Sequence, residues 1–295
     1  MGEQQKSISL FQQLRLFLEL IKFPHTVFAL PFAFTGAILA AQGIPEWKKV
    51  FWILVAMVGA RTGAMAVNRL VDMDLDALNP RTATRALPRG LIRPATVFIV
   101  AACSFALLVF AAAQLNRLCL LLSPVAIGLT IFYSYTKRFT SFSHVILGLC
   151  LACAPIGAWI AVRGRVDLPP LILGLAVLFW VAGFDILYAL ADIESDRTHG
   201  LCSIPAKLGA EAGMRVSLFF HIAVPVLLWV VGQLLRLGPL YYLGVLFVIM
   251  LLGYEHATMR RHGLQRLEAA FFNVNGLISI TLFTFTLLDA LIIAF

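Results

Sequence analysis

The chain is a succession of long apolar runs separated by short polar segments. Because a helix needs about 20 apolar residues to cross a bilayer, these runs predict transmembrane helices. We expect nine spans, near residues 23–42, 48–70, 95–115, 118–136, 141–162, 170–191, 214–234, 239–257 and 270–294. Residues 1–21 carry apolar side chains at spacings of mostly three and four, which predicts an amphipathic helix lying in the membrane interface. The pattern therefore predicts an all-α integral membrane protein with a transmembrane domain over 22–295.

Composition supports this class and excludes others. The chain has 295 residues, of which 61% are hydrophobic and 13% are charged, whereas soluble domains are roughly 45–50% apolar. The net charge of +8 comes without a basic tract with interleaved aromatic residues, so no nucleic-acid partner is expected. The five cysteines form neither a disulfide framework nor a zinc spacing, and the polar opening residues do not form a signal peptide.

The basic residues indicate how the chain is oriented. Sixteen of the 23 Lys and Arg residues fall in loops on the N-terminal side of the predicted membrane, six fall on the other side, and Arg61 lies within a span. Cytoplasmic loops are enriched in Lys and Arg. We therefore expect a multi-pass protein of the cell inner (cytoplasmic) membrane, with its N-terminus and its charged motifs in the cytoplasm.

Two polar motifs follow apolar runs, at residues 68–90 and 185–209. Asp72 and Asp76 in the first recur as Asp192 and Asp196 in the second, and both pairs are offset by 120 residues. Each pair follows an even-numbered predicted span, so both face the same side of the membrane. This arrangement predicts a parallel internal repeat.

Helical spacing gives the motifs a chemical interpretation. Asn68 shares one helix face with Asp72 and Asp76, and Asp185 and Tyr188 share another with the second acid pair. Two acidic faces that meet repel each other unless a cation lies between them. Magnesium fits, because it takes one or two carboxylates and completes its shell with water and phosphate. The expected metal ligands are Asp72, Asp76, Asp192 and Asp196. The residues expected to bind a diphosphate are Asn68, Arg81, Arg85, Lys137, Arg138 and Arg197.

These strings resemble a known family. NRLVDMDLDALNPRTATRALPRG (68–90), YTKR (135–138) and DILYALADIESDR (185–197), with GLCSIP after it, are similar in content and order to the UbiA superfamily of intramembrane aromatic prenyltransferases. The resemblance covers essentially the whole chain. It implies nine transmembrane helices around a central cavity, with cytoplasmic helical cap loops that carry the acids. It also implies transfer of a polyprenyl chain from polyprenyl diphosphate to an aromatic acid.

One departure concerns the acceptor. Many family members that act on 4-hydroxybenzoate have Asn-Asp at the start of the first motif, whereas here Asn68 is followed by Arg69. This form looks more like the UbiA-like branch associated with menaquinone biosynthesis through futalosine. The expected acceptor is therefore 4-hydroxybenzoate or a dihydroxynaphthoate, in ubiquinone or menaquinone biosynthesis. The sequence leaves the acceptor, the prenyl chain length and the oligomeric state open.

Further side chains are candidates for catalysis or acceptor binding. The four aspartates, Asp185 and Tyr188 are the expected catalytic set, with magnesium and the basic residues stabilising the leaving diphosphate. Tyr133, Tyr135 and Tyr188 are candidates either to stabilise an allylic cation through their ring faces or to anchor the chain at the interface. Arg61 lies two helical turns before Asn68 and is the expected ligand of the acceptor carboxylate, with the diphosphate or snorkelling as alternatives. No histidine is expected to bind a metal.

Two other classes share some of these features. Transporters with parallel repeats have sites near the membrane midplane in broken helices, whereas these acids gather at one membrane face. CDP-alcohol phosphotransferases also use magnesium and aspartates at a membrane face, but their D-G-x2-A-R continuation is missing after Asp76.

Overall fold

The computed structural model describes residues 23–263 and 273–293, and within these ranges the chain is helical without strands. Eight helices are long and apolar enough to cross a membrane. These are α3 (Trp47–Val71), α5 (Pro94–Leu115), α6 (Arg117–Thr136), α7 (Ser143–Arg163), α8 (Leu168–Ala189), α11 (Ala210–Leu235), α12 (Pro239–His262) and α14 (Asn275–Ile293). The all-helical membrane fold and these eight predicted spans are confirmed, with bounds that mostly agree within a few residues.

A further helix, α2 (Phe23–Ala41), coincides with the first predicted span and packs between α7 and α14. Because the structure describes the side chains of this helix only over Leu30–Ala41, the count of nine spans stays a prediction. The predicted interfacial helix over residues 1–21 lies outside the described residues. Residues 270–272 and 294 of the last predicted span, 270–294, also lie outside the described residues, and α14 covers most of the rest of that span.

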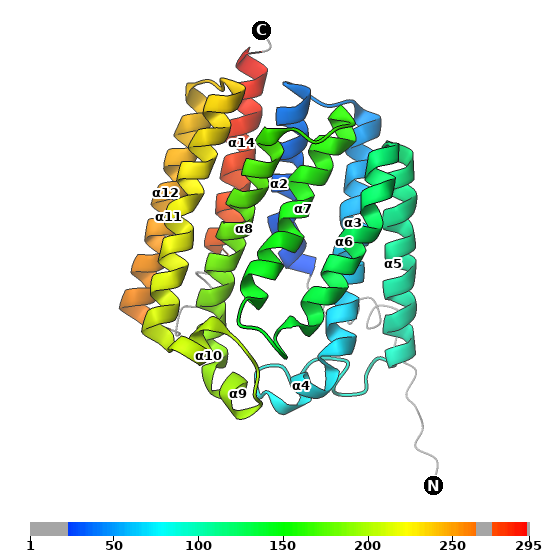
Figure 1. The fold of residues 1–295 in the computed structure, drawn as a ribbon, viewed down its shortest axis with the longest axis vertical. Coiled ribbons are helices and arrows are strands. Elements are labelled where there is room, and N and C mark those ends of the chain that lie inside the picture. The colour runs from blue at the N-terminus through cyan, green and yellow to red at the C-terminus, as the bar shows by residue number, and fades with distance from the viewer. Residues whose placement is uncertain (1–22, 264–272, 294–295) are drawn as a thin grey trace.

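The helices stand side by side as a bundle, and the short helices cap one end of it (Figure 1). These short helices are α4 (Met73–Leu78), η1 (Leu190–Asp192), α9 (Ile193–Thr198) and α10 (Ile204–Leu208). Each acid pair therefore sits where a long helix gives way to a short one, after α3 in the first motif and after α8 in the second. Both motifs lie at the same end of the bundle, as a parallel repeat requires.

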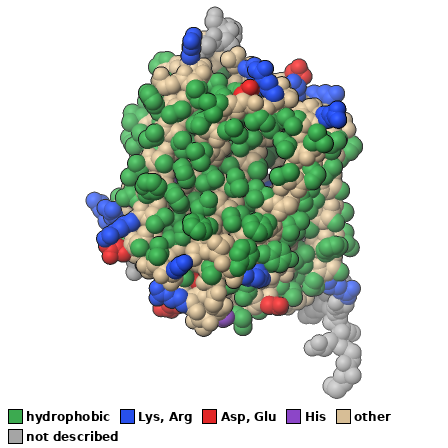
Figure 2. Space-filling model, in the orientation of Figure 1, with side chains coloured by type: hydrophobic (Ala, Val, Ile, Leu, Met, Phe, Trp, Pro, Cys, Tyr) green, Lys and Arg blue, Asp and Glu red, His purple; other side chains and the backbone are tan. Residues whose placement is uncertain are grey.

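The outer surface matches a membrane protein. Figure 2 shows hydrophobic side chains over the middle of one face, with Lys, Arg, Asp and Glu side chains near its two ends. Large apolar side chains such as Phe98, Phe219 and Val125 are more than half exposed. Apolar side chains exposed along the helices fit a bilayer, because soluble monomers rarely expose large contiguous apolar patches.

Close helix contacts at glycines hold the bundle together. Gly59 on α3 lies against the α5 backbone, where an added Cβ would be 2.7 Å from the Ser104 carbonyl oxygen. Gly36 on α2 meets the Pro155 backbone of α7 in the same way, and Gly148 on α7 meets that of Leu178 on α8. Small residues allow helix backbones to approach closely, which is how membrane helices gain packing energy.

The C-terminal half also contains a buried polar chain. The Trp180 indole N–H donates to Asn275 Oδ1 (2.8 Å), and Asn275 Nδ2 donates to Glu255 Oε1 (2.8 Å). His221 and His256 lie beside it, with 2.9 Å between their Nδ1 and Nε2 atoms. The chain ties α8, α11, α12 and α14 together, away from the cavity that the motifs line.

Candidate active site

One cavity of about 530 Å³ lies between α3, α6, α7 and α8 and reaches into the capped end. Its lining changes along its length. At the cap it is polar, with aspartates from both motifs, arginines from the first motif and Lys137 from the end of α6. Along the bundle it is apolar, down to Ile53 near the start of α3 and Ile160 near the end of α7. On α3 the lining runs from Ile53 to Asp72, which at 1.5 Å per residue is about 28 Å.

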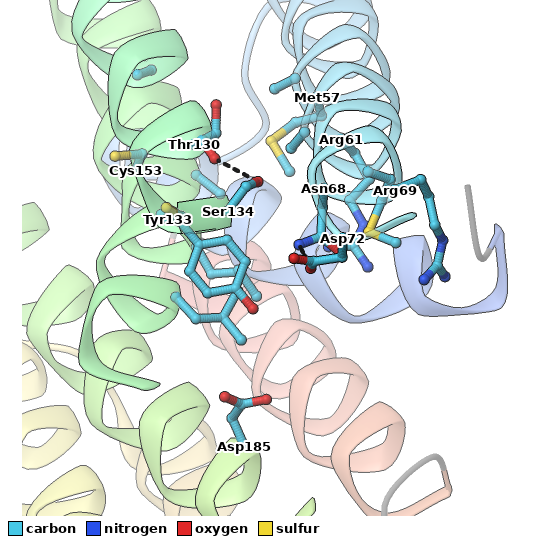
Figure 3. Close-up of a pocket in the computed structure, with 18 of the residues that line it drawn as sticks. Met57, Arg61, Asn68, Arg69, Asp72, Thr130, Tyr133, Ser134, Cys153 and Asp185 are labelled. Carbon is cyan, nitrogen blue, oxygen red and sulfur yellow. Dashed lines mark hydrogen bonds between the residues drawn. The ribbon is translucent and has the colours of Figure 1, made fainter. Parts of the chain in front are cut away.

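The structure brings together most of the predicted site residues. The predicted residues that line this cavity are Arg61, Asn68, Asp72, Asp76, Arg81, Arg85, Tyr133, Lys137, Asp185, Tyr188, Asp192 and Asp196. Figure 3 shows Tyr133 and Asp185 across from Arg61, Asn68 and Asp72. Their gathering follows from the fold, because α3 and α8 both end at the capped face and α6 ends beside them.

Residues of the first motif bind an acid of the second. Arg81 binds Asp192 with two donors, Nε to Oδ1 at 3.0 Å and an Nη to Oδ2 at 2.6 Å. Its other Nη donates to the Tyr188 hydroxyl at 2.6 Å, and its guanidinium lies 4.9 Å from the centre of that ring. Asn79 adds a third donor to Asp192 at 3.2 Å. The two motifs therefore form one site rather than two separate copies.

The first acid pair is also held by cations. Arg85 lies 2.6 Å from both oxygens of Asp76, and Arg69 lies 3.7 Å from the same carboxylate. Asp72 accepts from Asn68 Nδ2 at 2.9 Å and from Arg138 at 3.2 Å. Burial raises the pKa of Asp72 above its ordinary value, and the Arg138 charge opposes this only in part. The arginines thus offset the repulsion that motivated the prediction of a cation.

Lys137 adds a positive charge at the centre of the acids. Burial disfavours its charged form, but the carboxylates of Asp185, Asp196, Asp192 and Asp72 outweigh burial and raise the pKa of Lys137. The ammonium group is therefore charged at neutral pH. Its position on the cavity wall fits a group that meets an anion inside the cavity.

Three predicted residues do not line the cavity. Arg138 reaches Asp72 and also donates to the backbone carbonyls of Val71 and Ser134. Arg197 is exposed and donates through Nε to the Ala206 carbonyl, in a second, shallower hollow on the outside of the cap. Tyr135 is 46% exposed and lies under the Arg138 guanidinium. Their roles in binding stay predictions.

In the cavity wall or directly behind it lie three residues that the sequence analysis did not select. Arg69, treated there only as a departure from the family pattern, is buried in the wall beside Asp76. Asn79 was part of the quoted motif but had no role assigned. His144 is fully buried, and its Nδ1 is 2.6 Å from Asp185 Oδ2. The N-P-R-T string after the first acid pair could have indicated Asn79, whereas no local signal indicated His144.

The donor atoms suit magnesium better than a metal enclosed by protein alone. Among the residues that the structure describes, no group of three or more His, Cys, Asp or Glu could hold a metal ion. Asp196 is 3% exposed, and its Oδ2 is buried without a hydrogen-bond partner there. Magnesium takes one or two carboxylates and keeps sites for water and phosphate. The site therefore fits an ion that is bound jointly by aspartates and a phosphorylated ligand.

Residues 29–277 match the UbiA prenyltransferase family. The 4-hydroxybenzoate octaprenyltransferase of Aeromonas salmonicida is 30% identical over 241 residues, covering 80% of this chain and 82% of that protein. The enzyme of the same name from Nitrosomonas eutropha is 32% identical, covering 87% and 89%. The chain belongs to the UbiA prenyltransferase family, and it is a multi-pass membrane enzyme that transfers prenyl groups.

Solved structures show the same fold. The apo structure of a UbiA homologue from Aeropyrum pernix superimposes with a TM-score of 0.83 at 32% identity, over 90% of this chain and 98% of that one. A UbiA homologue from Archaeoglobus fulgidus bound to GPP and Mg²⁺ has a TM-score of 0.72 at 19% identity, over 93% and 99%. The second likeness establishes the fold alone.

Proposed function

We propose that this enzyme transfers a polyprenyl chain from polyprenyl diphosphate to the ring of an aromatic acid, with Mg²⁺ as its cofactor. The observation that carries the proposal is the composition of the cavity that both motifs line. Its charged end joins carboxylates and cations that suit a diphosphate and its metal, and its apolar length suits a hydrocarbon chain. The relatives named as 4-hydroxybenzoate octaprenyltransferases, and the homologue bound to GPP and Mg²⁺, support this assignment.

The cations of the site stabilise the leaving group. Breaking the bond between the first prenyl carbon and the diphosphate oxygen leaves the electron pair on the diphosphate, which gains negative charge. Arg81 and Arg85 present guanidinium forks that bind phosphate bidentately, and Lys137 adds a point charge. Magnesium, held by Asp72, Asp76, Asp192 and Asp196, supplies further charge stabilisation when bound. Fixed charges aimed at developing charge are commonly the largest single contribution to catalysis.

Residues deeper in the cavity accept the ring. The ring carbon donates an electron pair to the allylic carbon, forms the new carbon–carbon bond and then loses its proton. The faces of Tyr133 and Tyr188 stabilise the allylic cation and exclude water from it. Arg61 binds the acceptor carboxylate. Its Nε is buried with no hydrogen-bond partner among the described residues, and a carboxylate would provide one.

Asp185 is the proposed partner of the acceptor hydroxyl and the acceptor of the released proton. It lies on the cavity wall across from Arg61 (Figure 3). His144 Nδ1 is 2.6 Å from the Oδ2 atom of Asp185. An acceptor ring lying between Arg61 and Asp185 would place its carboxylate at Arg61 and its hydroxyl at Asp185.

The prenyl tail extends along the apolar part of the cavity toward lipid. Leu122 and Val125 on α6 line the cavity and are 38% and 64% exposed. A tail in the cavity can therefore reach the bilayer past α6. The capped end faces the cytoplasm, as the excess of Lys and Arg on that side supports.

The test is an assay of membranes that contain the enzyme, supplied with radiolabelled polyprenyl diphosphate. 4-Hydroxybenzoate, 1,4-dihydroxy-6-naphthoate and 1,4-dihydroxy-2-naphthoate are presented in parallel, with Mg²⁺ or with EDTA. We expect a labelled, lipid-soluble prenylated ring from one of these acids, and none with EDTA. The matched variants are Asp192→Asn, which should lose activity, and Asp74→Asn, which should keep it. Asp74 is an exposed aspartate that does not line the cavity. Absence of product with all three acids, or equal activity with EDTA, would refute the proposal.

A further inference from the structure

A buried histidine connects the cavity wall to the cap. His144 lies in the first turn of α7 and has no exposed surface. Its Nδ1 is 2.6 Å from Asp185 Oδ2 on α8, and the backbone N–H of Ile204, the first residue of α10, points at its Nε2 from 3.4 Å. The His144 ring therefore contacts Asp185 of the cavity wall through Nδ1, and α10 at the capped end of the bundle through Nε2.

The two contacts determine which nitrogen carries the proton. The Ile204 backbone N–H can only donate, so the Nε2 atom of His144 accepts and carries no hydrogen. In the neutral ring the proton is then on Nδ1, which donates to the Asp185 carboxylate. A carboxylate that accepts a hydrogen bond at 2.6 Å is held in one orientation, because a side chain bonded from a buried ring cannot change rotamer without losing that bond.

The cap is tied to the bundle at the same place by a second bond. The backbone N–H of Cys202 donates to the Lys137 carbonyl oxygen at 2.7 Å. The loop between α9 and α10 is thus fixed at two points, the end of α6 and the start of α7. Asp196 lies just before this loop and lines the cavity. The position of this loop therefore affects the positions of the second acid pair and of Asp185.

We propose that His144 is a positioning residue. It holds Asp185 toward the acceptor, and through the Ile204 amide it fixes α10, the short helix that follows the second acid pair. This inference rests on the proposed function, since it gives Asp185 its orientation for the acceptor hydroxyl. His144 itself does not line the cavity and does not touch the substrates.

Replacing the ring by isosteric groups tests its two hydrogen bonds. His144→Gln keeps one donor and one acceptor on a side chain of similar reach, whereas His144→Leu keeps neither. We expect His144→Leu to lower kcat/KM for the acceptor by roughly tenfold to a hundredfold, with the KM for prenyl diphosphate changed by less than about threefold. His144→Gln should recover most of this loss. His221→Gln is the matched control, because it alters a buried histidine remote from the cavity and should not change the ratio of the two KM values.

Amide hydrogen exchange gives a readout independent of turnover. His144→Leu removes the acceptor of the Ile204 amide, so that amide should exchange faster, while His144→Gln should keep it protected. Wild-type kinetics in His144→Leu, equal damage in both variants, or unchanged exchange at Ile204 would overturn the inference. Failure of the proposed function appears differently: the wild-type enzyme then forms no product with any of the three acids, whatever the exchange at Ile204.

Discussion

Arg61→Lys tests whether the deep arginine binds the acceptor. Arg61 lies seven residues before Asn68 on α3, about 10 Å along the helix axis, and lines the cavity with its Nε buried and without a hydrogen-bond partner among the described residues. Lysine preserves the charge but replaces the planar fork by a single point of contact. Loss of a bidentate contact to a carboxylate costs on the order of 2–3 kcal/mol. This corresponds to roughly a 30- to 150-fold loss in kcat/KM.

The assay varies each substrate in turn at saturating levels of the other. The KM of the acceptor should rise in Arg61→Lys while the KM of prenyl diphosphate stays near its wild-type value. Arg85→Lys is the matched control at the charged end, because Arg85 binds Asp76 there, and it should raise the KM of the diphosphate substrate instead. An unchanged acceptor KM in Arg61→Lys, or an equal loss for both substrates, would refute the assignment.

Three further outcomes follow from the site and the packing. Asp72→Asn and Asp192→Asn should each abolish turnover at limiting Mg²⁺ while the protein stays folded, and wild-type-like product formation in either would remove that carboxylate from the metal site. Arg81→Lys loses the fork that joins the two motifs, so kcat should fall at least tenfold in steady-state measurements. A change confined to KM would contradict this. Gly59→Ala forces a Cβ to 2.7 Å from the α5 backbone and should cost about 1–3 kcal/mol of stability. Gly128→Ala, with open space around its added Cβ, should leave thermal unfolding unchanged or raise its midpoint.

Local sequence was sufficient to predict the helices and the ends at which the acids lie. The apolar runs bound α3 and α6 to within one residue, because span length and hydropathy are properties of a continuous segment. Asp72 follows the apolar run of α3 and Asp192 follows that of α8, and these positions placed both acids at one end of the bundle. The same reasoning could place Arg61 two turns deeper on α3, because helical period alone determines that relation.

Pairings across long stretches of chain were not predictable in this way. His144 and Asp185 are 41 residues apart, and Asn79 and Asp192 are 113 apart, so their contacts depend on how α7, α8 and the caps pack. The sequence indicated that the two acidic faces would repel unless a cation lay between them. It did not indicate that arginines bind Asp192, Asp76 and Asp72 in the structure, and the metal stays a prediction. Arg138, which is expected to bind the diphosphate, contacts Asp72 and two backbone carbonyls, and its role in binding stays a prediction.

The apolar length of the cavity, whose lining includes the 64% exposed Val125, has a kinetic consequence. A donor whose tail stays in the bilayer meets this enzyme by diffusing in two dimensions, and the prenylated ring leaves along the same plane. Turnover should then follow the mole fraction of donor in the membrane rather than its concentration in the bulk volume. Adding inert lipid at constant total donor would slow the reaction, whereas adding buffer would not.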